Sequence, residues 1–188
     1  MNRRHYLAAS AAVAGTLLSG CAGLTGETTL GSPTEERDDE GLRLVYVHEG
    51  EAIATVSFGQ EPDGAAIRRL FIGIERADDT TLERFRFRFA PEVEEPYPME
   101  IYLRPSPEGW YEEHEVYRTT EATVVRVDGL GRGKSGTVSC QLLVHGELDG
   151  GGDLPPLRIE HDLTLSRDDP LGERFAIHGE RSVDLDDL

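Results

Sequence analysis

Apolar and polar residues alternate along the chain, and residues 84–89 show this alternation most clearly. Phe85, Phe87 and Phe89 are separated by Arg86 and Arg88. Successive side chains of a β-strand point to opposite faces of a sheet, so this spacing places the Phe rings on one face and the Arg side chains on the other. On a helix the same rings would be spread around the cylinder. The segment therefore predicts a strand with one buried and one solvated face.

Other stretches with the same two-residue period occur from Leu42 onward, and Gly, Pro and Asp residues separate them. They cover residues 42–46, 52–58, 70–74, 99–103, 122–127, 137–148, 157–165 and 175–177. Glu49-Gly50 is typical of a tight hairpin turn, whereas residues 110–117 fit no period clearly. Short strands at regular spacing predict an all-β fold, namely an antiparallel β-sandwich of immunoglobulin-like form with about 8–10 strands.

The first 21 residues depart from this pattern and are organised like an export signal. Arg3 and Arg4 precede an apolar run over residues 6–18, which is shorter than the ~20 residues that a spanning helix needs. A basic start, a short apolar run and small residues before a cleavage point are typical of a signal peptide. Arg3 and Arg4 resemble the twin-arginine (Tat) export motif, and the Leu-Ser-Gly-Cys of residues 18–21 resembles the lipobox of prokaryotic lipoproteins.

These resemblances imply export in the folded state, cleavage after residue 20 and lipidation of Cys21. Two lipid chains on one cysteine are enough to hold a protein on the extracellular side of the cell membrane without a spanning helix. Residues 22–41 are rich in Gly, Thr, Ser, Pro and acidic residues, which predicts a flexible tether. We therefore expect a signal peptide (1–20), a lipidated Cys21 with a linker (21–41) and a β-sandwich domain (42–188).

The composition adds a strong acidic bias. The chain has 36 Asp and Glu against 19 Lys and Arg, and Lys134 is its only lysine. Nucleic acids bind clustered basic side chains, so this charge argues against a nucleic-acid partner. It also disfavours flat contact with anionic lipid. The acidic, lysine-poor composition resembles that of haloarchaeal proteins. At molar salt the Debye length is ~3 Å, and repulsion among surface carboxylates is screened.

Two glycine-rich segments contain motif-like residues. Residues 131–136 end like a phosphate-binding P-loop, but that motif needs a following helix, and the residues after it alternate like a strand. Asp128 also stands where the P-loop has glycine. We interpret the segment as a hairpin loop. The acidic loop 149–153 offers oxygen ligands for calcium without the full ligand pattern of a calcium loop. We favour a solvated turn, leave calcium binding open there, and expect no cofactor and no metal.

Candidate catalytic residues are few. His161 lies on the apolar face of its strand, where it is either a base oriented by Asp162 or, as we favour, a hydrogen-bonded core histidine. Cys140 alternates with apolar residues and is expected to be buried rather than nucleophilic. Glu clusters at 92–95 and 112–115 resemble the carboxylate pairs of glycosidases, but such clusters arise by chance in an acidic chain. We assign no catalytic residue and do not expect an enzyme.

Arg84, Arg86 and Arg88 form a basic stripe on this acidic protein. The stripe either binds an anionic glycan or an acidic partner, or pairs with Asp and Glu of neighbouring strands, and we favour pairing. The sequence as a whole favours a membrane-anchored binding or interaction module of the cell envelope. Two alternatives stay open: an extracellular hydrolase that uses a carboxylate pair, and a structural or assembly factor of an envelope complex.

Overall fold

The computed structural model describes residues 26–38, 41–62, 67–93, 99–104, 114–128, 138–146, 154–168 and 172–188. Twelve strands and one short 3₁₀ helix, η1 (Leu185–Asp187), lie in this part of the chain. The strands are β1 (Glu27–Leu30), β2 (Thr34–Asp38), β3 (Gly41–His48), β4 (Glu51–Pro62), β5 (Ile67–Arg76), β6 (Thr80–Pro91), β7 (Met99–Arg104), β8 (His114–Arg118), β9 (Thr123–Asp128), β10 (Val138–Gly146), β11 (Leu157–Arg167) and β12 (Arg174–Val183).

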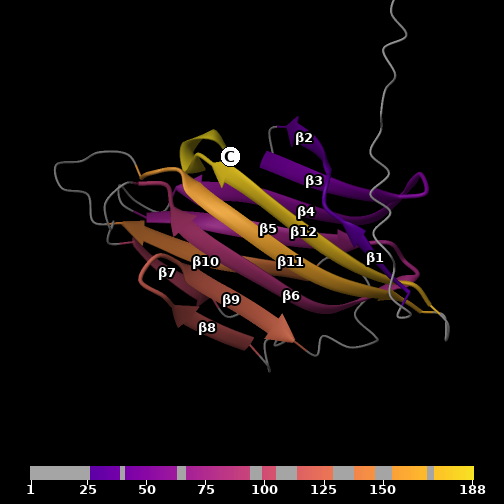
Figure 1. The fold of residues 1–188 in the computed structure, drawn as a ribbon. Helices are drawn as coiled ribbons and strands as arrows, with labels where there is room; N and C mark the ends of the chain where they lie inside the picture. The colour runs from indigo at the N-terminus through magenta and orange to yellow at the C-terminus, as the bar shows by residue number, and fades with distance from the viewer. Residues whose placement is uncertain are drawn as a thin grey trace, which may run out of the picture.

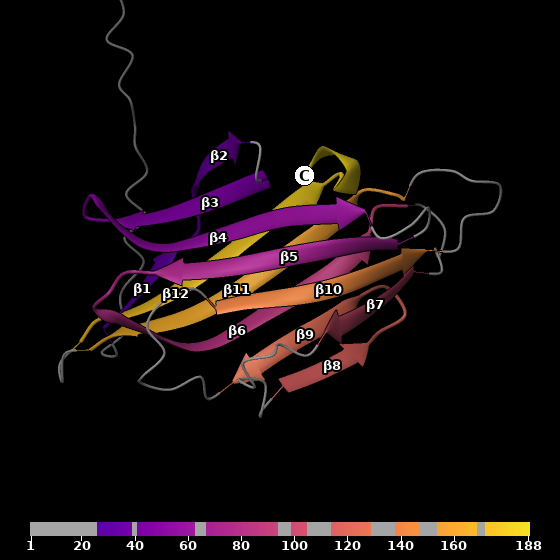
Figure 2. The same ribbon diagram turned by 180° about the vertical axis from the view of Figure 1, so that it is seen from behind.

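The strands form two six-stranded sheets that lie face to face (Figures 1 and 2). Sheet A has the order β1-β12-β11-β6-β9-β8, and sheet B has the order β2-β3-β4-β5-β10-β7. All pairings are antiparallel except that of β1 with β12, which is parallel. The predicted fold class, an antiparallel β-sandwich of immunoglobulin-like form, is confirmed.

Alternating residues of both sheets fill the space between them. Phe85, Phe87 and Phe89 of β6 are fully buried, as the sequence predicts. The ring of Phe87 meets that of Phe58 from β4 edge-on, with centroids 6.4 Å apart. Edge-to-face contacts of this kind add to the free energy gained by removing aromatic surface from water. Tyr46 of β3 extends the same core toward sheet A.

The β3–β4 connection confirms the predicted hairpin turn. Glu49 and Gly50 both have positive φ angles, of 50° and 88°. Two successive positive φ values match the right-handed twist of the flanking strands, which is why this turn joins β3 and β4 directly. Glycine adopts such an angle without a steric penalty, whereas Glu49 adopts it against its intrinsic preference.

The prediction of a flexible tether over residues 22–41 is wrong for residues 27–38. The first part forms β1 on sheet A, and the second forms β2 on sheet B. Leu30 packs against the core, while Glu35 and Glu36 form ion pairs with Arg181 and Arg43. An edge strand needs backbone hydrogen bonds and little apolar surface, so polar composition did not reveal it. The domain therefore begins near residue 27, not at 42.

These two strands and β8 raise the number of strands to twelve, above the expected eight to ten. All three are edge strands of their sheets or belong to segments without a clear apolar period. The five residues of β8 are all exposed, so no buried side chain marks them in the sequence. Periodicity detects strands through their buried face, which explains why these three were not identified.

Candidate functional site

The predicted export and lipidation residues lie outside the described residues. They comprise Arg3, Arg4, Cys21 and the rest of the segment up to residue 25. In the part of the chain that is described, no helix has the length and apolar character needed to cross a membrane. The same part contains no group of three or more His, Cys, Asp or Glu side chains arranged to hold a metal ion.

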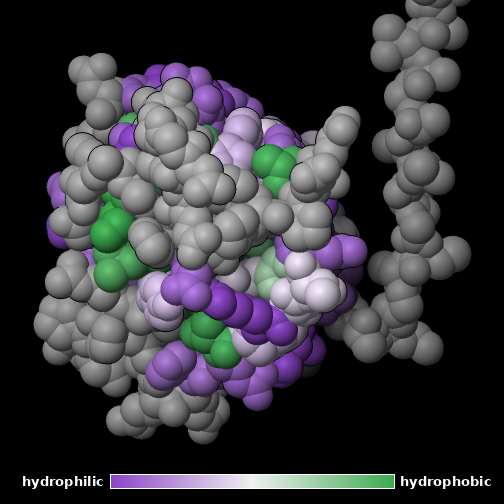
Figure 3. Space-filling model, turned by 90° about the vertical axis from the view of Figure 1, so that its left-hand side faces the viewer, coloured by the Kyte–Doolittle hydropathy of each residue, from purple (hydrophilic) through white to green (hydrophobic). Residues whose placement is uncertain are grey.

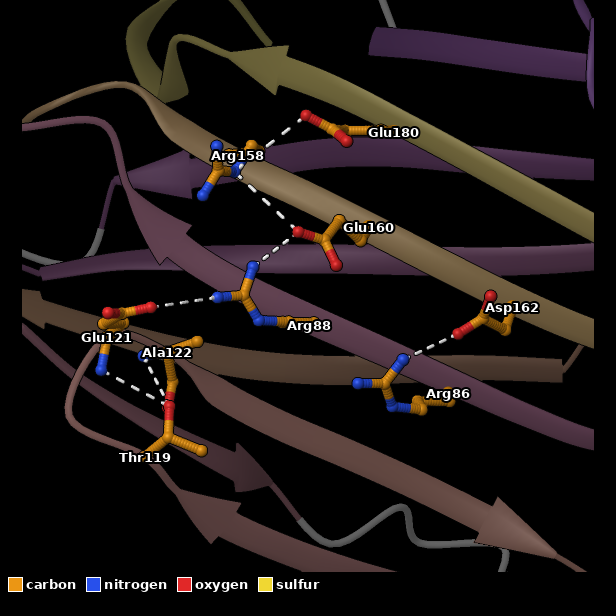
Figure 4. Close-up of polar contacts among 9 residues, drawn as sticks. All are labelled: Arg86, Arg88, Thr119, Glu121, Ala122, Arg158, Glu160, Asp162 and Glu180. Carbon is orange, nitrogen blue, oxygen red and sulfur yellow. Dashed lines mark hydrogen bonds and ion pairs between the residues drawn. The ribbon is translucent and has the colours of Figure 1, made fainter.

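The arginine stripe lies on the outer face of sheet A and is paired across strands (Figure 4). Arg86 donates to Asp162 of β11 over 2.8 Å, and Arg88 donates to Glu160 of β11 over 2.5 Å. Arg84 donates to the hydroxyl of Thr164 over 3.2 Å. At Arg86 and Arg88 the structure therefore shows cross-strand pairing with acidic neighbours, which is the interpretation that the sequence favours. A ligand for this face stays a prediction.

The pairing extends beyond β6 and connects charges on four strands. Asp162 lies 2.7 Å from Nδ1 of His178 on β12. Burial raises the pKa of Asp162, but hydrogen bonds from His178 and Arg86 outweigh it, so the pKa of this carboxyl lies below its usual value. On β9, Asp128 lies 4.0 Å from Arg84 of β6 and 2.6 Å from Arg126 of its own strand. Opposite charges that face each other across a sheet stabilise the pairing of strands.

Arg84 has the most open position of the three arginines. Its guanidinium is 4.0 Å from Asp128, and its side chain is 53% exposed. A small hollow of about 220 Å³ lies beside it, lined by Glu83, Arg84, Asp128, Thr164 and Arg174. Arg174 in turn donates to Glu83 over 2.7 Å. Two carboxylates thus accompany the two arginines, so this hollow does not concentrate positive charge.

His161 is a core histidine, as the sequence favours. It points between the sheets and is 1% exposed, and its Nε2 lies 2.6 Å from the hydroxyl of Tyr46 on β3. Burial raises the pKa of Tyr46 to about 12, so the hydroxyl keeps its proton. Burial also lowers the pKa of His161 to about 4, so the ring is neutral near neutral pH. Asp162 points to the opposite face and does not orient this ring.

Glycine at position 179 makes the contact between His161 and Tyr46 possible. Gly179 is paired with His161 across β11 and β12. A Cβ atom at this position would overlap the Tyr46 hydroxyl and the imidazole ring. Nδ1 of His161 is buried and has no hydrogen-bond partner among the described residues. The pair therefore joins the two sheets through one hydrogen bond, away from solvent.

The other candidates fall partly or wholly outside the described residues. These are the loops at 131–136 and 149–153, Lys134, and the acidic residues at 94, 95, 112 and 113. Of the two Glu clusters, Glu92 accepts a hydrogen bond from Ser182 over 2.5 Å, and Glu115 lies 3.9 Å from Arg126. Cys140 belongs to β10, and its backbone is in register with Ile72 of β5. The side chain of Cys140 is not among those described.

The outer face of sheet B contains a larger hollow that sequence reasoning missed. Its volume is about 560 Å³, within the range of small-ligand sites. Ser57 of β4 contributes a small side chain, Gly59 of β4 and Gly73 of β5 contribute no side chain, and Phe71 of β5 contributes an aromatic ring. Its lining is Asp38, Leu42, Arg43, Ser57, Phe58, Gly59, Gln60, Glu61, Phe71, Ile72, Gly73 and Glu75. The register of β4 and β5 pairs Ser57 with Gly73 and Gly59 with Phe71, which places these four residues side by side.

The polar groups of this hollow are mostly hydrogen-bond acceptors. Asp38, Glu61 and Glu75 are carboxylates, and Arg43 is the one basic side chain in the lining. Its guanidinium lies 3.6 Å from Glu75 and 3.8 Å from Glu36. The buried Oε1 of Gln60 has no hydrogen-bond partner among the described residues. Gln60 alternates with the outward residues Gly59 and Glu61 and pairs with the core residue Leu70, so its side chain lies on the inner face of sheet B and not in the hollow.

A family model covers almost the whole described domain. It matches residues 27–187 and carries the description "Domain of unknown function (DUF8121)". The chain belongs to this family. The matched range begins at the first residue of β1, which agrees with the domain boundary seen in the structure. No curated protein matches the chain.

Solved structures that are similar to the chain match it at low sequence identity and low TM-score. The GAE domain of GGA2p from Saccharomyces cerevisiae is 10% identical and has a TM-score of 0.40, over 75% of this chain and 96% of that one. A collagen-binding domain from a Staphylococcus aureus adhesin is 7% identical, with a TM-score of 0.36, over 65% of this chain and 96% of that one. The N-terminal periplasmic domain of ScsB from Proteus mirabilis is 12% identical, with a TM-score of 0.32, over 75% and 50%. At these scores the likeness carries no functional conclusion.

Proposed function

We propose that this protein is a Tat-exported lipoprotein of a salt-adapted cell and that it acts as an extracellular binding module. Lipid on Cys21 would anchor it in the cell membrane, with the sandwich outside. The support is the order of Arg3, Arg4, the apolar run and Cys21 at the chain start. The acidic composition supports a saline exterior, where charge screening makes a large net negative charge tolerable.

The hollow on the outer face of sheet B is the binding site in this proposal, and this hollow is the observation that carries it. It combines the Phe71 ring, small residues on the floor and three carboxylates, of which Glu61 lies 3.1 Å from Arg69 and Glu75 lies 3.6 Å from Arg43. Sugar hydroxyls donate to carboxylates, and the apolar face of a sugar ring packs against an aromatic side chain. A neutral saccharide of the envelope therefore fits this lining. At molar salt, attraction between charged groups is screened, whereas hydrogen bonds and apolar contacts persist.

A saccharide-binding measurement tests this function. The membrane-extracted protein, kept at high salt, is applied to an array of neutral oligosaccharides, and the strongest binders are measured by calorimetry. Phe71→Ala should weaken binding by about tenfold, because the loss of an aromatic contact in a ligand site costs on the order of 1–2 kcal/mol. Tyr102→Ala is the matched control, because Tyr102 is 51% exposed on β7 and does not line the hollow.

Three outcomes would contradict the proposal. The protein would bind no neutral saccharide on the array, the Phe71→Ala variant would bind as well as the unchanged protein, or both variants would lose binding equally. The first outcome removes the ligand class. The other two place the binding site elsewhere than the hollow.

A further inference from the structure

Strand β1 fixes the N-terminal end of the domain to one particular end of the sandwich. Its residues pair with β12 from Glu27 onward, in register with Arg174. The backbone N–H of Arg174 donates to the carbonyl of Gly26 over 3.3 Å, and the Thr28 hydroxyl donates to Glu173. The chain is therefore attached to the sheet at the position where β12 begins.

That position lies at the end of the sandwich where β3 meets β4 and β5 meets β6 (Figure 1). His48 of β3 lies 3.3 Å from Glu173, the residue before β12. Arg167, at the end of β11, forms ion pairs with Glu51 of β4 and with Asp79 in the β5–β6 turn. These contacts join both sheets at one end, which we call the anchor end. The turn between β8 and β9, which contains Thr120, lies at the opposite end.

The chain between the predicted lipid and the domain is short. Only five residues separate Cys21 from Glu27. Six Cα–Cα steps reach at most ~20 Å when fully extended. A ten-residue strand such as β12 spans ~33 Å. The connection is therefore shorter than the domain, and it keeps the anchor end within ~20 Å of the lipidated residue.

We propose that the anchor end of the sandwich faces the lipid bilayer and that the opposite end points away from it. This inference rests on the lipidation of Cys21 that is part of the proposed function. It replaces the expectation of a twenty-residue tether with a short connection that limits how the domain is presented. The hollow on sheet B then opens sideways, along the membrane plane, and the β8–β9 turn lies farthest from the lipid.

The anchor end carries an excess of acidic groups, which affects its interaction with a charged membrane. Its described residues include more carboxylates than basic groups: Glu27, Glu49, Glu51, Asp78, Asp79, Asp168 and Glu173 against His48, Arg76, Arg167 and Arg174. This end is repelled by anionic lipid headgroups when salt is low, and the repulsion is screened at molar salt. The covalent connection, rather than charge attraction, keeps it near the bilayer. In Figure 3, the described residues of the opposite end are hydrophilic ones with several smaller hydrophobic patches between them.

Energy transfer to the membrane tests this orientation. The full lipidated protein is reconstituted into phosphatidylglycerol vesicles that contain an acceptor-labelled lipid. A donor dye is attached through a clickable non-canonical residue at position 78, in the exposed β5–β6 turn, or at position 120 as the matched control at the opposite end. Transfer from position 78 should be at least twofold more efficient than transfer from position 120 at molar salt. Lower salt should decrease transfer from position 78.

A longer connection provides the second arm of the experiment. Insertion of a twenty-residue Gly/Ser segment after Ala22 should make transfer from the two positions nearly equal, since such a chain is flexible and longer than the natural connection. Equal transfer with the natural connection would overturn the orientation while anchoring stands. Absence of transfer from both positions would overturn anchoring itself. The two failures are therefore distinguishable.

Discussion

The two outer faces of the sandwich use their polar residues differently. On sheet A, Arg86 and Arg88 lie within 2.8 Å of acidic partners on β11, Asp162 also contacts His178 of β12, and Arg84 lies 4.0 Å from Asp128 of β9. On sheet B, the central strands carry Ser57, Gly59 and Gly73 at outward positions, and a hollow of about 560 Å³ lies over them. The basic stripe, for which the sequence favours cross-strand pairing, is paired with neighbouring carboxylates at Arg86 and Arg88, whereas small and inconspicuous residues form the larger hollow.

This contrast shows that a charge pattern and a binding surface are different properties. A stripe of three arginines is conspicuous in an acidic sequence, but cross-strand register places carboxylates beside it. Paired charges keep the surface solvated and favour the correct register of the strands. A hollow forms where small residues lie side by side on adjacent strands. The pairing of β4 with β5 places Ser57 beside Gly73 in this way.

The largest effect is expected where Tyr46 of one sheet contacts His161 of the other, because both outer faces depend on that shared core. Gly179→Ala places a methyl group against the Tyr46 hydroxyl and the His161 ring. We expect a loss of about 3 kcal/mol in the free energy of unfolding, since overpacking a filled core forces side chains out of position. Chemical denaturation measures it. Gly31→Ala is the control, because its Cβ would meet only the His178 carbonyl at 4.0 Å, and a loss as large as that of Gly179→Ala would contradict this account.

Acid should destabilise the protein through the same contact. The pKa of His161 is about 4 in the folded protein, below its usual value of 6.5, so the unfolded chain binds this proton more readily. The contribution of the neutral His161 ring to the free energy of unfolding is therefore fully present above about pH 6.5 and is lost as the pH falls toward 4. This residue accounts for about 3 kcal/mol of the loss.

The His161→Leu variant checks the assignment of this pH dependence. It should be less stable than the unchanged protein at neutral pH, because Tyr46 loses its hydrogen-bond partner. Between pH 6.5 and 4 its free energy of unfolding should fall less steeply than that of the unchanged protein. Parallel curves in this interval would assign the dependence to groups other than His161.

The smallest effect separates the two outer faces directly. A double-mutant cycle with Arg86→Ala and Asp162→Ala on sheet A should give a coupling of about 0.5–1 kcal/mol at moderate salt. The pair of Arg43 and Glu75 on sheet B, whose atoms are 3.6 Å apart, should give a coupling near zero. Unfolding in denaturant measures both cycles. Equal couplings would remove the distinction between a paired face and an open one.

The sequence predicts the interior better than the edges. The spacing of Phe85, Phe87 and Phe89 identifies β6 and its buried face, and Glu49-Gly50 identifies a turn, because these signals are local. The sequence predicts a tether in place of strands β1 and β2, because neither strand has buried residues that would produce an apolar alternation. The contact between Tyr46 and His161, 115 residues apart, follows from how the sheets pack and has no local signal.

The hollow on sheet B was not predictable for a similar reason. Ser57 and Gly73 are ordinary strand residues when each is considered alone, and only the antiparallel register of β4 and β5 places them side by side. In contrast, the pairing of Arg86 with acidic residues could be anticipated, because many carboxylates lie on the neighbouring strands of so acidic a chain. The composition of the chain therefore indicates acidic partners for the arginines of sheet A, but it does not indicate the hollow on sheet B.

The mass of the mature N-terminus tests the central claim most directly, since anchoring and orientation both depend on it. Protein extracted from the membranes of its native host would be digested, and its N-terminal peptide measured by mass spectrometry. We predict a peptide that begins at Cys21 and carries a lipid group on its sulfur. A peptide that begins at another residue, or a Cys21 with a free thiol, would contradict the account.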